Sequence, residues 1–266
     1  MNKYFEENKK SWNRRVNLHY KSDFYDVKSF LQGGSSLKFI EVEALGDVRK
    51  KSVLHLQCHF GLDSLSLARK GAIVTGIDFS DQAISTAKKL SEQSNISARF
   101  ICCNLYESEH YLNEQFDIVF TSYGVLGWLD DLQEWGRLVA KFLKPGGFFF
   151  IAEFHPFLGL FDEKFEKLKY SYFYSSDPGL FTSAGSYAMP DDKMVFSEYQ
   201  WNHSLQDVFQ VMLKNDLRIE DFREYPFSVY NCFPNLVQGK DGWWRIGGLF
   251  DKIPMMFSLK ALKSAI

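Results

Sequence analysis

Short apolar runs alternate with amphipathic segments along residues 52–155 of the chain. Bounded apolar runs are typical of buried strands, and apolar residues spaced three and four apart are typical of helices. The runs predict strands at residues 53–56, 73–78, 98–103, 116–121 and 148–153, and the spacing predicts helices at 63–69, after Ser80 and at 132–142. The polar segment before residue 116 is also expected to be helical. Strands that alternate with helices predict a parallel, doubly wound α/β sheet.

The pattern changes after His155. Residues 156–201 are aromatic and polar without sustained periodicity, as expected of an insertion or lid. Helical spacing returns at residues 204–215, and apolar runs then predict strands at 217–225 and 255–262, joined by a long connection. Two late strands joined in this way are expected to pair antiparallel at one edge of the sheet.

These segments predict a single domain over residues 1–266 with four parts. We expect an N-terminal helical part at 1–48, a ligand-binding half at 50–155, the lid at 156–201, and a C-terminal helix with the last two strands at 202–266. Right-handed crossovers place the ligand of such a sheet beyond the carboxyl ends of its strands, near the first one.

Charge and cysteine content narrow the class of protein. Lysine and arginine total 31 against 33 acids, a formal net charge of −2, so no basic surface for nucleic acid is expected. The charged N-terminus does not resemble a signal peptide, and no apolar run approaches the ~20 residues that span a membrane. Four cysteines without a paired framework suit a reducing compartment. We therefore expect a cytoplasmic protein with no membrane partner.

Five features in a fixed order carry the most specific signal. They are a strand that enters a small loop with Gly61, an acid (Asp78) that ends the second strand, a polar residue (Asn104) that ends the third, Phe-Asp-Ile-Val at 116–119, and Leu-Lys-Pro-Gly-Gly-Phe at 143–148. Each feature alone has a purely structural interpretation in most α/β proteins. Together they resemble the class I S-adenosylmethionine-dependent methyltransferases, over roughly residues 50–155, and within them the bacterial small-molecule branch.

The resemblance implies a Rossmann-like sheet of about seven strands, the last antiparallel, with S-adenosylmethionine as methyl donor and a small-molecule acceptor. It also implies a set of donor-binding residues that follow the first four strands: His55, Leu56, Gln57, Cys58, Gly61, Asp78, Phe79, Ser80, Asn104, Leu105, Ser122, Tyr123 and Gly124. Within this set Asp78 would accept hydrogen bonds from the ribose hydroxyls, or would merely cap the helix that follows. Asn104 would meet the adenine amino group, and Tyr123 would either face the sulfonium or act as a packing residue.

The first loop departs from the family pattern. Gln57 and His59 occupy positions where that pattern has glycines, and only Gly61 is kept. We expect both residues to adopt backbone angles open to ordinary side chains, or the turn to be wider. The neighbouring Trp128, Leu129 and Trp135 have helical spacing and are expected in the core.

A general base helps methyl transfer only when the acceptor begins protonated. Glu153 and His155 follow the fifth strand and alternate onto one face, so they are the catalytic candidates, with His203 as a third. The alternative is that Glu153 holds a loop amide and His155 satisfies the start of the lid. Residues 12–20 would fold over the donor as a helical cap, or would pack as ordinary amphipathic surface.

Several competing interpretations remain open at this stage. His55, Cys58 and His59 are chemically able to bind zinc, but no second cluster supplies the remaining ligands, so no metal is expected. A dinucleotide oxidoreductase would need a Gly-x-Gly-x-x-Gly loop, which is absent here. An aminopropyl-transferring enzyme would share the donor fold. A non-catalytic binding or interaction module would keep the fold with an altered first loop.

Overall fold

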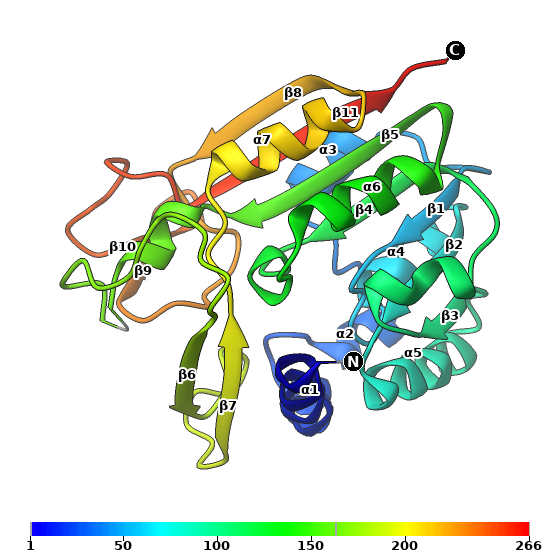
Figure 1. Ribbon diagram of the computed structural model, residues 1–266. Coiled ribbons are helices and arrows are strands. Elements are labelled where there is room, and N and C mark those ends of the chain that lie inside the picture. Colours follow the sequence, from blue (N-terminus) through cyan, green and yellow to red (C-terminus); the bar gives the residue numbers. More distant parts are fainter. Residues whose placement is uncertain (1, 163, 266) are drawn as a thin grey trace.

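A seven-stranded sheet forms the centre of the computed structural model, which describes residues 2–162 and 164–265 (Figure 1). The strand order is β3-β2-β1-β4-β5-β11-β8. The strands are β1 (Ser52–His55), β2 (Ile73–Asp78), β3 (Arg99–Cys102), β4 (Phe116–Ser122), β5 (Leu143–Phe154), β8 (Leu217–Tyr225) and β11 (Met256–Lys263). Strands β1 to β5 pair in parallel, whereas β11 pairs antiparallel with both β5 and β8. The predicted fold class and the antiparallel last strand are confirmed.

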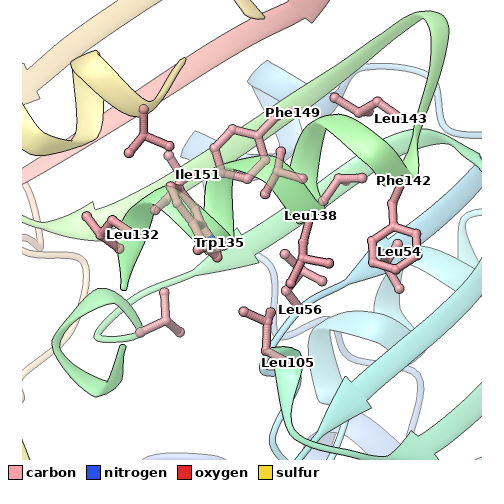
Figure 2. Close-up of a cluster of buried hydrophobic side chains, with 14 of the residues drawn as sticks. Leu54, Leu56, Leu105, Leu132, Trp135, Leu138, Phe142, Leu143, Phe149 and Ile151 are labelled. Carbon is pink, nitrogen blue, oxygen red and sulfur yellow. The ribbon is translucent and has the colours of Figure 1, made fainter. Parts of the chain in front are cut away.

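Helices cover both faces of this sheet. They are α1 (Lys3–Lys21), α2 (Val27–Leu31), α3 (Phe39–Leu45), α4 (Leu62–Arg69), α5 (Asp81–Ser94), α6 (Leu132–Phe142) and α7 (Leu205–Lys214). Because side chains alternate along a strand, Leu54 packs with α6 while its neighbour Val53 packs with α3 and α4. Figure 2 shows the first of these clusters, in which the Trp135 ring packs edge-on against the Phe149 ring.

Three short 3₁₀ helices follow strand ends: η1 (Leu105–His110), η2 (Leu126–Trp128) and η3 (Pro156–Leu160). The polar segment expected to be helical is therefore a 3₁₀ helix. Trp128 lies in η2 and is only half-buried, so its expected place in the core is wrong, whereas Leu129 and Trp135 are buried there as expected. Helical spacing did not distinguish a core residue from one beside a cavity.

The insertion after β5 contains an antiparallel hairpin of β6 (Gly179–Ala184) and β7 (Val195–Gln200). Most side chains of β6 are exposed, so the segment carries none of the apolar alternation that signals a strand in sequence. Figure 1 shows the hairpin extending away from the sheet beside α1. A second small hairpin, β9 (Leu236–Gln238) with β10 (Trp244–Ile246), lies in the connection before β11. Within the described residues, no helix combines the length and apolar character needed to span a membrane.

A glycine sets the distance between α6 and α7. A side-chain carbon added at Gly136 would overlap Val211 Cγ1 of α7. We expect Gly136→Ala to lower the free energy of unfolding by about 1–3 kcal/mol through overpacking, although alanine is the better helix former. Urea unfolding of this variant, of Val211→Ala and of the double variant would test the contact. The double variant should lose clearly less than the sum of the two single losses, and additive losses would contradict this packing.

Candidate active site

The carboxyl ends of β1, β2, β4 and β5 open into one cavity of about 1320 Å³. The other walls come from α1, the β6–β7 hairpin and the loop around Tyr230. The cavity is lined by most of the residues predicted from sequence: His55, Gln57, Cys58, Gly61, Asp78, Phe79, Asn104, Leu105, Ser122, Tyr123, Gly124, Glu153 and His155. The sheet topology thus brings residues about 100 positions apart to one place, as the carboxyl ends of parallel strands require.

Leu56 and Ser80 are the two predicted site residues that do not line this cavity. The Leu56 side chain belongs to the apolar cluster on the α6 face. Ser80 is fully buried, caps α5 by accepting from the Ala83 amide at 3.1 Å, and donates its hydroxyl to Asn13 Oδ1 at 2.6 Å. Ser80 therefore contributes to the site indirectly, through its hydrogen bonds with Ala83 and Asn13.

The first loop contradicts the expectation for its backbone. Gln57 has φ of 52° and His59 has φ of 50°, in the left-handed region that costs a non-glycine residue about 1–2 kcal/mol. The conformation of each residue is stabilised by a hydrogen bond to a residue outside the loop. The Gln57 side-chain amide donates to the Val125 carbonyl at 3.0 Å, and the His59 amide donates to Asp78 Oδ2 at 2.9 Å. The turn keeps the glycine-type geometry without the glycines.

The conformation and surroundings of Gly61 require a residue without a side chain. Its φ is 78°, and a Cβ at this position would lie 2.6 Å from the Phe100 ring. The backbone is therefore pressed against the ring at the point where α4 begins. This close approach explains why the third position of the loop remains glycine.

Asp78 ends β2 with its carboxylate held in place. Besides the His59 amide, the Ser80 amide donates to Asp78 Oδ1 at 2.8 Å, so each oxygen has a fixed partner and a remaining lone pair. Burial raises the pKa of the Asp78 carboxyl from 3.8 to about 6, and these backbone donors oppose the rise. Asn104 also has a local role, because its Oδ1 accepts from the Tyr106 amide at 3.0 Å and caps η1.

Glu153 holds the loop that follows β4. Its carboxylate accepts backbone N–H groups from the residues Gly124, Val125, Leu126 and Phe154. The loop is strained, with φ of 29° at Tyr123 and 73° at Gly124. Burial raises the pKa of the Glu153 carboxyl, and the four donors oppose the rise. Glu153 lines the cavity but its lone pairs are committed to the loop, so the structural interpretation describes it better than the catalytic one.

His155 and His203 are also engaged in structural contacts. His155 Nδ1 accepts from the Phe157 amide at 3.1 Å, and Nε2 lies 2.9 Å from a Glu224 carboxylate oxygen. Burial lowers the pKa of His155, and Glu224 opposes that effect. His203 Nε2 lies 2.7 Å from the Leu129 carbonyl oxygen. The His155 imidazole cannot take a proton at Nδ1 without losing the Phe157 contact, whereas the contact of His203 uses Nε2 alone.

The N-terminal helix and the hairpin meet above the first loop. His19 of α1 lies between them, with Nδ1 3.0 Å from His59 Nε2 and Nε2 2.7 Å from the Ser186 hydroxyl. Burial lowers the pKa of His19 to about 2 and that of His59 to about 3, so both rings are neutral and can share one proton between donor and acceptor nitrogens. Trp12 packs edge-on against His59 and Trp128. Helix α1 thus covers the loop.

Sequence reasoning missed a second group of polar residues beneath the β1 and β4 ends. Asp63 accepts from the Ser36 hydroxyl at 2.6 Å and from the Ser122 hydroxyl at 3.2 Å. Glu41 of α3 is fully buried and accepts from the Tyr123 hydroxyl at 2.9 Å. One signal was available, two acids in the segment 39–45 whose other residues are apolar, but nothing in the sequence related Glu41 to Tyr123.

The zinc interpretation of the first loop has little geometric basis. In residues 2–162 and 164–265, no three His, Cys, Asp or Glu side chains gather as a metal site would require. His55 Nδ1 lies 2.8 Å from the Ser64 hydroxyl, and His59 is paired with His19. Burial raises the pKa of the Cys58 thiol well above its usual value, which disfavours the thiolate that binds metal.

Comparison with known proteins agrees with the fold and the place of the cavity. A family model described as a methyltransferase domain matches residues 53–147. The ubiquinone biosynthesis O-methyltransferase of Coxiella burnetii is 35% identical over 116 residues, which are 44% of this chain and 48% of that protein. The corresponding protein of Escherichia coli is 32% identical over 110 residues, 41% of this chain and 45% of its own length. The chain therefore spans about half the length of the curated relatives it matches.

Solved structures resemble a larger part of the chain. An S-adenosylmethionine-dependent methyltransferase from Mesorhizobium loti has a TM-score of 0.57 at 16% identity, covering 88% of this chain and 100% of its own. One from Clostridium acetobutylicum also has a TM-score of 0.57 at 16% identity, covering 97% of this chain and 98% of its own. At such identity the likeness concerns the fold.

The strand order, the cavity at the strand ends and the matched domain define a class I methyltransferase fold. Residues 53–147 match the model of a methyltransferase domain, and the fold of the chain resembles that of S-adenosylmethionine-dependent methyltransferases.

We expect Glu153→Gln to destabilise the protein. The new side-chain NH₂ group would face backbone N–H donors, and leaving two of them buried without an acceptor costs about 2–5 kcal/mol. Chemical unfolding measures this loss, with Glu220→Gln on the exposed part of β8 as the control. An undiminished free energy of unfolding together with lost turnover would instead favour a catalytic Glu153.

Proposed function

We propose that this protein transfers a methyl group from S-adenosylmethionine to a small-molecule acceptor. The observation that carries the proposal is the single cavity at the strand ends of a methyltransferase domain. Its volume of about 1320 Å³ exceeds the roughly 300–1,000 Å³ of a site for one ligand, which leaves room for a donor and an acceptor together.

The polar groups at the first loop fit the proposed donor. Asp78 offers two oriented oxygens with spare lone pairs, which suits a pair of neighbouring hydroxyls. Two buried atoms beside it, His55 Nε2 and Gln57 Oε1, have no hydrogen-bond partner within the described part of the chain. Buried polar atoms without partners are uncommon, and a polar ligand would satisfy them. We assign the donor to this side, with Phe79, Asn104 and Leu105 around its base and the backbone of Ser122 to Gly124 beside its sulfur.

When bound, S-adenosylmethionine would supply a methyl carbon activated by a positively charged sulfur. The chain's own contribution is then to hold the two partners in line, and positioning of this kind can supply most of the acceleration. Helix α1 and the hairpin exclude water from the first loop through the contacts of Trp12 and His19. Glu153 fixes the shape of the loop that separates the donor side of the cavity from the acceptor side.

The acceptor side is lined by aromatic side chains from several elements: Phe24, Tyr25, Tyr123, Phe154, Tyr187, Tyr230 and Phe233. Such walls suit a flat or partly apolar small molecule. The matched relatives are named O-methyltransferases, which supports an oxygen acceptor. The family model ends at residue 147, so it does not cover the acceptor-side residues Phe154, Tyr187, Tyr230 and Phe233. The four free thiols suit action in the cytoplasm.

We expect Asp78→Ala to weaken binding of S-adenosylhomocysteine at least 100-fold while the protein stays folded, because the ribose hydroxyls lose their acceptor. Isothermal titration calorimetry measures the affinity and circular dichroism the fold. Glu92→Ala, an exposed acid on the helix that follows β2, is the matched control. Binding by the Asp78 variant as tight as that of the parent would refute the donor site.

The hairpin supplies a test of the acceptor side. Replacing residues 185–194 with Asn-Gly would keep the Ala184 and Val195 pairing in a two-residue turn, while removing Ser186 and Tyr187. We expect affinity for S-adenosylhomocysteine to change less than about threefold and transfer of labelled methyl into a metabolite extract to fall at least tenfold. Leu180→Ser, at an exposed position of the same hairpin, is the control. Equal loss of binding and transfer would indicate a purely structural hairpin.

A further inference from the structure

A buried acid and a phenol form a pair at the acceptor side of the cavity. Glu41 lies near the start of α3 with 0% of its surface exposed, and its Oε2 accepts from the Tyr123 hydroxyl at 2.9 Å. Its other oxygen, Oε1, has no hydrogen-bond partner among the described residues. Tyr123 lines the cavity, whereas Glu41 lies behind it. The phenol therefore stands between the cavity and the acid.

The surroundings of Glu41 keep it protonated at rest. Burial, and next the nearby charge of Asp63 on α4, raise the pKa of Glu41 from 4.5 to about 8. Other titratable groups that face this region are Tyr123 itself, Tyr230 and Lys38. The Tyr230 ring lies edge-on to Tyr123 at 5.1 Å, and the Lys38 ammonium lies over the Tyr230 ring at 4.7 Å. His55 completes the group beside Asp63.

The burial of Glu41 lowers the stability of the fold, which is unexpected for a residue whose only role is packing. A buried carboxyl with one unsatisfied oxygen is less stable than an apolar side chain of the same size. Tyr123 also has φ of 29°, a strained value for a residue with a side chain. Strain and a perturbed acid that coincide at the wall of a cavity are typical of a functional site. Glu153 and His155 are occupied by structural contacts, whereas Glu41 keeps one oxygen without a hydrogen-bond partner among the described residues.

We propose that Tyr123 receives the acceptor's proton during methyl transfer and passes its own proton to Glu41. This inference rests on the proposed function and names its general base. Tyr123 is the catalytic residue, because it lines the cavity and its hydroxyl is hydrogen-bonded to Glu41, and Glu41 acts through it. The pair would serve acceptors whose nucleophilic atom carries a proton, such as a hydroxyl or an ammonium group, and would be of no use to a thioether.

The transfer balances in charge and atoms. The acceptor atom forms a bond to the methyl carbon, and the carbon–sulfur bond breaks with its electron pair left on sulfur. The proton from the acceptor atom moves to Tyr123 Oη as the phenolic proton moves to Glu41 Oε2. Glu41 changes from carboxylate to acid, and bulk water receives the proton after the product leaves. No other reactant is needed.

Two variants and a control test this relay. Glu41→Gln keeps a hydrogen-bond acceptor for Tyr123 but cannot take a proton, and Tyr123→Phe removes the phenol. We expect each variant to lower the transfer of labelled methyl into a metabolite extract by about 10²–10⁴, with affinity for S-adenosylhomocysteine changed less than threefold. Glu43→Gln, on the exposed side of the same helix, should behave as the parent.

The pH profile separates a proton relay from a structural contact. Because Glu41 must be ionised to accept a proton, the parent's rate should rise tenfold per pH unit below about 8 and level off above it. The residual rate of Glu41→Gln should lack this rise. Parental turnover in either variant, or the same pH dependence in parent and Glu41→Gln, would overturn the relay.

The melting temperature reports on the protonation of Glu41 without the need for a methyl-acceptor molecule. Between pH 4.5 and about 8 the unfolded chain ionises Glu41 while the folded protein keeps the proton, so this residue destabilises the fold increasingly as pH rises. The melting temperature of Glu41→Gln relative to the parent should therefore be higher at pH 8 than at pH 5. An equal difference at both pH values would overturn the buried, proton-holding state of Glu41.

The outcomes also distinguish this inference from the proposed function. If the parent binds no S-adenosylhomocysteine and transfers no methyl group, the proposed function fails and the relay fails with it. If the parent binds and transfers while both variants keep its rate, the relay alone is wrong.

Discussion

The site depends on one buried carboxylate more than on any other single group. Glu153 gathers four backbone N–H groups at the point where β4 and β5 end, and so fixes a loop whose backbone is strained at Tyr123 and Gly124. A loop in this conformation would not persist on local preferences alone. Charge-assisted bonds to a carboxylate are among the stronger hydrogen bonds in proteins, and here they act where water is excluded. The carbonyl of Val125, whose position is fixed in this way, accepts a hydrogen bond from the Gln57 side chain of the first loop.

The first loop shows how a glycine-type turn survives with larger residues. Gln57 and His59 keep left-handed backbone angles, and each has a side-chain or backbone bond to a different element. His59 is further tied through His19 to Ser186 of the hairpin, across segments far apart in sequence. The altered residues thus make the first loop, the N-terminal helix and the β6–β7 hairpin into one hydrogen-bonded unit. That coupling gives a physical reason for side chains at positions where the family pattern has none.

Periodicity was sufficient for the sheet, because strands β1 to β5 carry continuous apolar runs and the helices between them carry apolar faces. The order of motifs placed most of the cavity-lining residues for the same reason, since parallel strands end at one edge. It failed for the hairpin, in which β6 is largely exposed, and for Trp128, whose helical spacing suggested the core. It could not choose between the catalytic and the structural interpretation of Glu153 and His155, because alternation shows which face a side chain takes and not which backbone amides lie within hydrogen-bond distance of it.

The sequence by itself determined the fold class, the strand that carries each polar site residue, and the edge of the sheet where they gather. These follow from local patterns of apolar and polar residues, which act over a few positions. Only the tertiary structure decided which polar atoms are already satisfied and which are left for a ligand or a proton. Glu41 and Tyr123 are 82 positions apart, and His19 and Ser186 are 167 apart. Contacts of that separation depend on how whole elements pack, and no local pattern encodes them.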